Sequence, residues 1–182
     1  YSTLLMLLCT VTGAFAQSMI ISGGGNHAVA LCSKGEIYAW GLNTSNSLCL
    51  EDPADAASAI VAKPSRVNAG GLTFPMLSAG SGGHSIALAC NGIVYGFGAN
   101  DYGQCGQPPC KHVSDTPKPV PCGDAPGYNL DGTPGGPYLG NIKYITATSG
   151  ASLAILNDGT GRCVVWGGNE TTVAGEFLKT AS

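Results

Sequence analysis

The sequence has few charged residues and no cluster of basic ones. Of its 182 residues only 8 are lysine or arginine and 11 are aspartate or glutamate, so the formal net charge is -3. A disordered chain combines low hydrophobicity with high net charge, whereas 44% of this chain is hydrophobic. Binding to nucleic-acid phosphates requires a basic surface, which this composition does not supply. We therefore expect a folded protein that does not bind nucleic acid.

The sequence also lacks an apolar run long enough to cross a bilayer as a helix. The longest run covers residues 4–16, whereas a spanning helix needs about 20 residues. A run of this length is typical of a secretory signal, and Ala14-Phe15-Ala16 fits the cleavage pattern of small residues. The sequence predicts a signal peptide over residues 1–16, truncated because it has no initiating Met, and an exported, extracellular or cell-surface protein of bacterial type. An apolar first strand is the alternative.

Motifs of the common enzyme classes are missing as well. The sequence has no H-E-x-x-H pair, no G-x-S-x-G nucleophile elbow and no phosphate loop ending in G-K-[ST]. The densest group of acidic residues lies over residues 51–55, where a solvated loop is the simplest explanation. We expect no enzymatic activity and no cofactor.

Seven cysteines remain once residues 1–16 are set aside. In an exported protein such cysteines form disulfides, and an odd number leaves one thiol over. Cys110 and Cys122 flank a proline-rich segment that has no other covalent cross-link, which predicts a disulfide between them. The alternative is a zinc site that also includes Cys105 and His112. The spacing C-x4-C-x-H-x9-C matches no compact zinc motif, so no metal is expected.

What the sequence does contain is 28 glycines, many of them in an internal repeat. Residues 19–43 and 76–100 align without a gap at an offset of 57, and a third copy follows over residues 145–169 with two extra residues in a turn. Each copy has two short β-prone segments around a turn containing glycine or asparagine, which is typical of a β-hairpin. The expected strands, with almost no helix, are residues 27–32, 36–41, 84–89, 93–98, 151–156 and 162–167.

The residues that recur at equivalent places are expected to be structural. A histidine repeated in successive units is expected to make a fixed hydrogen bond within or between units. A repeated large ring is expected to be buried in the core. Two of the asparagines begin N-x-[ST] sequences, but they fall on a turn of the repeat, so a structural role is preferred to glycosylation. The repeated residues are His27, His84, Gly35, Gly92, Trp40, Phe97, Trp166, Asn43, Asn100 and Asn169.

Hairpin units with spacings of this size, each too small to bury its own face, are typical of propeller blades. The pattern A-G-x-x-x-H-S-x-A-L-x-x-x-G-x-V-Y-x-F-G-x-N-x-x-G-Q-x-G over residues 79–106 resembles the repeat of the regulator of chromosome condensation family. That family forms seven-bladed β-propellers. The resemblance implies an all-β fold of about three blades in an incomplete ring, with the remaining blades missing from this chain. The expected repeats are residues 19–75, 76–143 and, in part, 144–182.

Two copies depart from the family pattern. In the first, Asn46 and Cys49 occupy glycine positions, and in the third Ala151 replaces the family histidine. These departures are expected to weaken the turn geometry of those copies, but they leave the hairpins unchanged.

The expected function is protein binding without catalysis. The segments 44–75 and 101–143 differ between copies and are expected to form a recognition face. The sequence thus predicts a secreted or cell-surface binding or adhesion module with an unknown protein partner. Tyr102, Tyr128 and Tyr138 are its candidate aromatic anchors. The resemblance implies two alternatives, a secreted inhibitor that plugs an enzyme and an exchange factor for a small GTPase, of which the predicted export disfavours the second.

Overall fold

The computed structural model describes residues 20–122, 127–168 and 176–178. The predicted signal peptide and Asn169 lie outside these residues. The described part contains three four-stranded antiparallel sheets, which we call blades 1, 2 and 3, and one two-stranded ribbon. Blade 1 is β1 (Ile20–Gly23), β2 (His27–Leu31), β3 (Ile37–Leu42) and β4 (Ile60–Arg66); blade 2 is β5 (Met76–Ala79), β6 (His84–Leu88), β7 (Val94–Ala99) and β8 (His112–Pro119); blade 3 is β11 (Ile142–Ala147), β12 (Ala151–Leu156), β13 (Cys163–Gly167) and β14 (Glu176–Leu178); the ribbon is β9 (Gly127–Tyr128) and β10 (Tyr138–Leu139).

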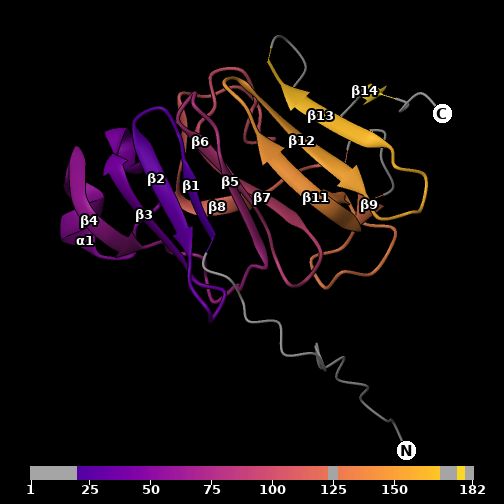
Figure 1. Ribbon diagram of the computed structural model, residues 1–182, viewed down its shortest axis with the longest axis horizontal. Helices are drawn as coiled ribbons and strands as arrows, with labels where there is room; N and C mark the ends of the chain where they lie inside the picture. Colours follow the sequence, from indigo (N-terminus) through magenta and orange to yellow (C-terminus); the bar gives the residue numbers. More distant parts are fainter. Residues whose placement is uncertain (1–19, 123–126, 169–175, 179–182) are drawn as a thin grey trace, which may run out of the picture.

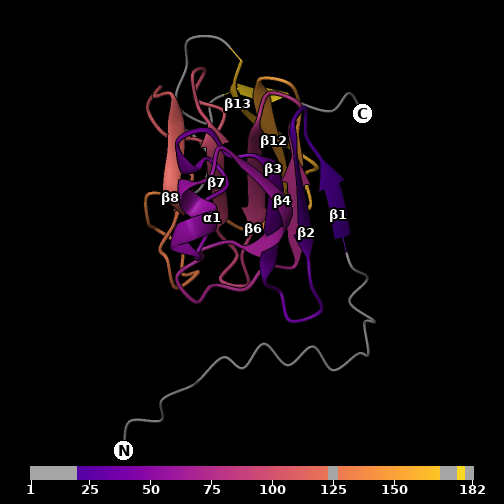
Figure 2. The ribbon, with the colours of Figure 1, turned by 90° about the vertical axis from the view of Figure 1, so that its left-hand side faces the viewer.

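The three blades lie side by side in chain order, and their first strands are neighbours (Figure 1). Within each blade every strand pairs with the next strand in sequence, so the sheet is a meander. The expectation of an all-β protein built from three propeller blades is confirmed. Among the described residues these blades do not close a ring. In the part of the chain that the structure describes, helix is limited to the short η1 (Thr44–Asn46) and α1 (Pro53–Ala57), which lies beside β4 (Figure 2).

The six strands expected from the sequence are confirmed to within one residue at each end. The turns between them contain Gly35 (φ 77°), Gly92 (φ 81°) and Gly159 (φ 78°). A left-handed backbone costs glycine little, which explains why the turn residues repeat along with the strands. No helix in the described part is long and apolar enough to cross a membrane.

The first strands of blades 1 and 2 correspond at an offset of 56, not 57. The Gly24 N–H bonds to the His27 carbonyl, whereas the equivalent bond in blade 2 joins Gly80 to His84. The turn before β6 is therefore one residue longer than the turn before β2. The gapless alignment is correct for the hairpins and wrong by one residue in the strand that precedes each of them.

Two apolar clusters fill the spaces between the blades. One includes Ile37 and Ala39 of blade 1 with Phe97 of blade 2, and the other includes Trp166 of blade 3. Phe97 and Trp166 are each 1% exposed. Trp40 is only half-buried, because successive strand residues alternate in direction and it points away from the face that Ile37 and Ala39 present to blade 2.

Candidate interaction site at the blade junctions

Asn43 and Asn100 shape the loops that follow the third strands of blades 1 and 2. Asn100 accepts a hydrogen bond from the Cys105 N–H at 2.8 Å and donates to the Pro108 carbonyl at 2.9 Å. Asn43 likewise accepts from the Leu48 N–H at 2.9 Å and donates to carbonyls of the α1 segment. Both side chains are buried. A buried amide with all these bonds fixes the loop on the end of its blade.

The departures from the family pattern do not change the shape of this loop. Gly103 and Gly106 have φ of 73° and 74°, and the equivalent Asn46 and Cys49 have φ of 55° and 53°. The expected weakening of the turn geometry in blade 1 is therefore absent from the backbone. Asparagine tolerates the left-handed region better than other side chains, whereas a buried cysteine there is strained.

The repeated histidines join neighbouring blades. His27 Nε2 lies 2.9 Å from the Ser85 hydroxyl, and His84 Nε2 lies 3.0 Å from the Ser152 hydroxyl. The Ser152 hydroxyl donates its proton to the Gln104 carbonyl at 2.8 Å. The His84 ring must therefore donate from Nε2, and its Nδ1 is buried without a partner among the described residues. Blade 3 has Ala151 at this position, so the histidine contact is not repeated there.

Burial keeps both imidazoles neutral. The pKa of His84 is lowered to about 4 by burial and by the nearby His27, and burial also lowers the pKa of His27. A general acid or base at neutral pH needs a pKa closer to 7. This pair is suited to holding blades together rather than to moving protons.

A second hydrogen bond repeats at both junctions. The Ala79 N–H donates to the Ser22 hydroxyl at 2.9 Å, and the Ala147 N–H donates to the Ser78 hydroxyl at 3.0 Å. Ser85 and Gln104 are part of the sequence pattern and Ser152 matches Ser85 in the repeat, but no contact between blades was predicted for them or for these serines. The only signal that could have identified Ser22 and Ser78 was the correct alignment of the first strands.

The predicted disulfide between Cys110 and Cys122 is not formed in the structure. Cys110 is an exposed free thiol that donates to the His112 carbonyl at 3.4 Å. The Cys122 backbone instead bonds to the Pro137 carbonyl at 2.9 Å. The two residues are tied to different segments, so flanking the same proline-rich stretch does not bring their sulfur atoms together.

The alternative zinc ligands do not gather either. Cys105 is fully buried, which raises the pKa of its thiol, and the thiol donates to the Ala99 carbonyl at 3.3 Å. Among the described residues, no group of three or more His, Cys, Asp or Glu side chains is placed to hold a metal ion.

The three candidate tyrosines do not share one surface. Tyr102 follows β7 and is 54% exposed. Tyr128 and Tyr138 face each other across the β9–β10 ribbon, are half-buried, and pack against the core cluster between blades 1 and 2. The Asn91 amide binds the Leu130 carbonyl at 2.9 Å, which places the ribbon segment at the other end of blade 2. Because β8 carries the chain across the blade, the segment 101–143 is divided between two ends.

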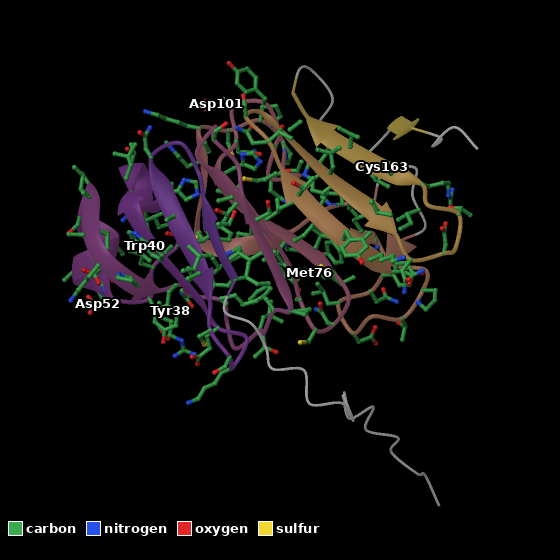
Figure 3. The ribbon with its side chains drawn as sticks, in the orientation of Figure 1. Tyr38, Trp40, Asp52, Met76, Asp101 and Cys163 are labelled. Atoms are coloured by element: carbon green, nitrogen blue, oxygen red, sulfur yellow. The ribbon has the colours of Figure 1, made fainter. Side chains whose placement is uncertain are left out.

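Each blade junction has a groove at the end where β7 finishes. The groove between blades 1 and 2, which we call groove 1–2, has a volume of about 250 Å³ and includes His27 and His112. The groove between blades 2 and 3, groove 2–3, has a volume of about 410 Å³ and is lined by Tyr102, Thr148, Ser149, Gly150, Ala151 and Gly168. Figure 3 shows Asp101 at this end of blade 2 and Met76 toward the other.

Comparison with known proteins identifies related sequences. The family model described as the regulator of chromosome condensation (RCC1) repeat matches residues 20–46, 77–104 and 91–126. The protein pim1 of Schizosaccharomyces pombe is 29% identical over 166 residues, which cover 90% of this chain and 29% of that protein. The secretion-regulating guanine nucleotide exchange factor of Bos taurus is 30% identical over 173 residues, which cover 92% of this chain and 35% of that protein. The chain thus spans about a third of these relatives.

A solved structure has the same fold. Yeast RCC1 (Prp20), determined bound to Kap60, matches with a TM-score of 0.60 at 21% identity over 88% of this chain and 37% of that chain. At this identity the similarity shows the fold alone.

The relatives overturn two expectations. Guanine nucleotide exchange acts on GTP-binding proteins inside cells, so a relative of this kind argues against an exported, extracellular or cell-surface protein. The predictions of export and of a secreted binding or adhesion module are wrong. The prediction depended on the apolar run at residues 4–16 and on the cysteines. The run lies outside the described residues, and the predicted disulfide is not formed.

Proposed function

The chain belongs to the regulator of chromosome condensation repeat family, and on this premise we propose that it is part of a propeller that promotes guanine nucleotide exchange on a GTP-binding protein. The observation that carries the proposal is the 30% identity to a guanine nucleotide exchange factor along 92% of the chain. The sequence had left exchange as the least favoured of three hypotheses.

The blade junctions are compatible with such a role. An exchange factor breaks no covalent bond, because it accelerates release by binding the nucleotide-free partner more tightly than the loaded one. It therefore needs a rigid surface rather than proton donors and nucleophiles. The neutral, hydrogen-bonded His27 and His84 supply rigidity of this kind between the blades.

The test measures nucleotide release with the full-length protein that contains this chain. Purified small GTPases from the same source are loaded with a fluorescent GDP analogue, and release into excess unlabelled GDP is followed with and without the protein. We expect release from at least one GTPase to rise by at least about tenfold. Release by EDTA serves as the positive control. Unchanged release from every GTPase that EDTA unloads would overturn the proposal.

A further inference from the structure

The sheet of blade 1 has one face with no neighbour among the described residues, which we call the outer face of blade 1. Ile21 lies on this face and is 65% exposed, whereas its equivalent Leu77 is 6% exposed in the apolar cluster between blades 1 and 2. None of the residues of the outer face is buried, and all of their equivalents in blade 2 are. The outer face carries Ile21, Ala28, Ala30, Tyr38 and Trp40, and the equivalents are Leu77, Ser85, Ala87, Tyr95 and Phe97.

Blade 3 has the opposite face uncovered in the described part of the chain, and we call it the outer face of blade 3. It includes a hollow of about 140 Å³ bordered by Tyr144, Thr146, Leu153, Ile155 and Cys163. The equivalent residues of blade 2 are Met76, Ser78, Ile86, Leu88 and Val94, and the apolar ones among them pack in or against the cluster between blades 2 and 3. Figure 3 shows Trp40 and Cys163 toward opposite ends of the row of blades.

The two outer faces are the two halves of a blade junction. The outer face of blade 3 corresponds to the face that blades 1 and 2 present to the blade that follows them. The outer face of blade 1 corresponds to the face that blades 2 and 3 present to the blade before them. At both junctions in the structure the first kind of face packs against the second. Blade 3 of one copy of this chain therefore presents the face that fits blade 1 of another copy, and uncovered apolar faces favour association.

The polar positions of the two outer faces also match each other. At each junction in the structure a histidine meets a serine of the next blade. Ala151 replaces the histidine on the outer face of blade 3, and Ala28 replaces the serine on the outer face of blade 1. One replacement without the other would bury a polar group whose partner is missing, which is costly. Alanine against alanine leaves no such group, so these two faces suit each other.

The second hydrogen bond of the junctions can be kept in this pairing. Ser22 and Ser78 each accept an N–H from the first strand of the following blade. Thr146 occupies the same position in blade 3, so its hydroxyl is placed to accept such a bond. Gly23 occupies the position of the donor in the first strand of blade 1. Packing blade 3 on blade 1 of another copy would thus form one of the two repeated bonds and replace the other by an apolar contact.

We propose that the outer face of blade 3 binds the outer face of blade 1 of a second copy of this chain. A head-to-tail contact of this kind either closes a ring or continues into a filament. Two copies of three blades make six, which lies within the roughly four to eight blades of β-propellers, whereas three copies would make nine. The contact therefore closes a ring of two copies. This inference goes beyond the proposed function and does not depend on it.

The first test is the mass in solution of the full 182-residue chain. Sedimentation equilibrium is recorded at protein concentrations from about 1 to about 100 μM. We expect twice the mass of one chain, with a Kd on the order of 10 μM or lower. The mass of a single chain at every concentration would overturn the proposal. A mass that rises beyond two copies would overturn the closed ring.

A pair of variants distinguishes a head-to-tail contact from a contact between like faces. Ile21→Asp places a charge on the outer face of blade 1, and Ile155→Asp places one on the outer face of blade 3. Each variant alone should associate at least about tenfold more weakly than wild type, because a buried carboxylate has no partner there. An equimolar mixture should associate at least about tenfold more tightly than either variant alone, because it contains one intact pair of faces.

The control for both variants is Leu130→Asp, which changes a leucine that is 50% exposed and belongs to neither outer face. It should associate as wild type does. Wild-type association by Ile21→Asp or Ile155→Asp would contradict the proposal. A mixture no tighter than its components would show that blade 3 does not meet blade 1.

Restoring the missing histidine–serine pair tests which residues meet. Positions 28 and 151 lie on opposite outer faces of one chain, so only a second copy can bring them together. Ala28→Ser and Ala151→His should each weaken association, because each buries an unpaired polar group. The double variant should associate at least about fivefold more tightly than the two separate effects predict, because the bond seen at the other junctions is formed. Additive effects would show that the two positions are not in contact.

Discussion

The same two hydrogen bonds join blade 1 to blade 2 and blade 2 to blade 3, but the two junctions differ in what surrounds these bonds. In both, a histidine reaches a serine of the next blade and a serine hydroxyl receives a backbone N–H. Only the second junction adds Gln104, which connects the histidine–serine pair to the loop carrying Tyr102. The repeat supplies the rigid contact, and at the second junction one further hydrogen bond, from the Ser152 hydroxyl to the Gln104 backbone carbonyl, ties that contact to a surface loop.

The largest difference should come from removing the aromatic residues of the two junctions. Phe97→Ala and Trp166→Ala should each lower the free energy of unfolding by about 3–5 kcal/mol, because each leaves a cavity between two blades. Trp40→Ala, at the equivalent but half-buried position of blade 1, should cost about half as much or less. Urea denaturation followed by circular dichroism measures all three. Equal losses for Trp40 and Phe97 would show that the apparent exposure of Trp40 is misleading.

Acid should weaken the second junction more than the first. The folded-state pKa of His84 is about 4, below the usual value of 6.5. Between these two pH values the unfolded chain therefore binds a proton that the folded chain does not bind. Stability from this residue is therefore full above pH 6.5 and falls as the pH drops toward 4, by up to about 3 kcal/mol. His84→Gln should flatten this part of the profile measured by urea denaturation at each pH. A profile with the same slope in wild type and variant would contradict the assignment.

Deleting the histidines individually should show which junction depends on its hydrogen bond more. His84→Ala should cost about 2–3 kcal/mol, because it empties a fully buried site and removes the bond to Ser152. His27→Ala should cost about 1–2 kcal/mol, because His27 borders groove 1–2 and water can enter the space. Thermal unfolding of the two variants side by side gives the ranking, and a larger loss for His27 would reverse the comparison.

The smallest expected effect concerns the loop after the third strand. Gly103→Asn should change stability by less than about 0.5 kcal/mol, because blade 1 carries Asn46 at the same left-handed position. Gly103→Ala should cost about 1 kcal/mol, since alanine has no polar group to support φ of 73°. Chemical denaturation resolves the pair only when both are measured against the same wild-type preparation. Equal costs would mean that the loop tolerates asparagine in blade 1 for a reason specific to that blade.

The hairpins could be predicted from the sequence because their determinants are local. Alternating β-prone residues and the turn glycines Gly35 and Gly92 lie within a few positions of the strands they control. The contacts between blades could not be predicted, because His27 meets Ser85 across 58 residues and no local pattern encodes that distance. The recurrence of Ser22 and Ser78 was missed because the first strands correspond at an offset of 56, not at the offset of 57 that aligns the hairpins.

The candidate site was predicted only in part. Tyr102 was selected as an exposed aromatic residue, but it was grouped with Tyr128 and Tyr138, which β8 separates from it. Groove 2–3 is lined by Tyr102, Thr148, Ser149, Gly150, Ala151 and Gly168, and the two glycines contribute only backbone to it. A glycine gives no signal of binding in a sequence, so these residues are noticed only when the structure places them beside the Tyr102 ring.

The meander in which every strand pairs with its neighbour in sequence also governs how the molecule opens. The contacts within a blade are local in sequence, so each blade can fold and unfold as a unit. Its stability then depends on the blades that pack beside it. Blade 2 has a described neighbour on each face, whereas blades 1 and 3 have one. Amide hydrogens of β6 and β7 should therefore exchange with solvent more slowly than those of β2, β3, β12 and β13, and the chain should lose its protection from the outer blades inward.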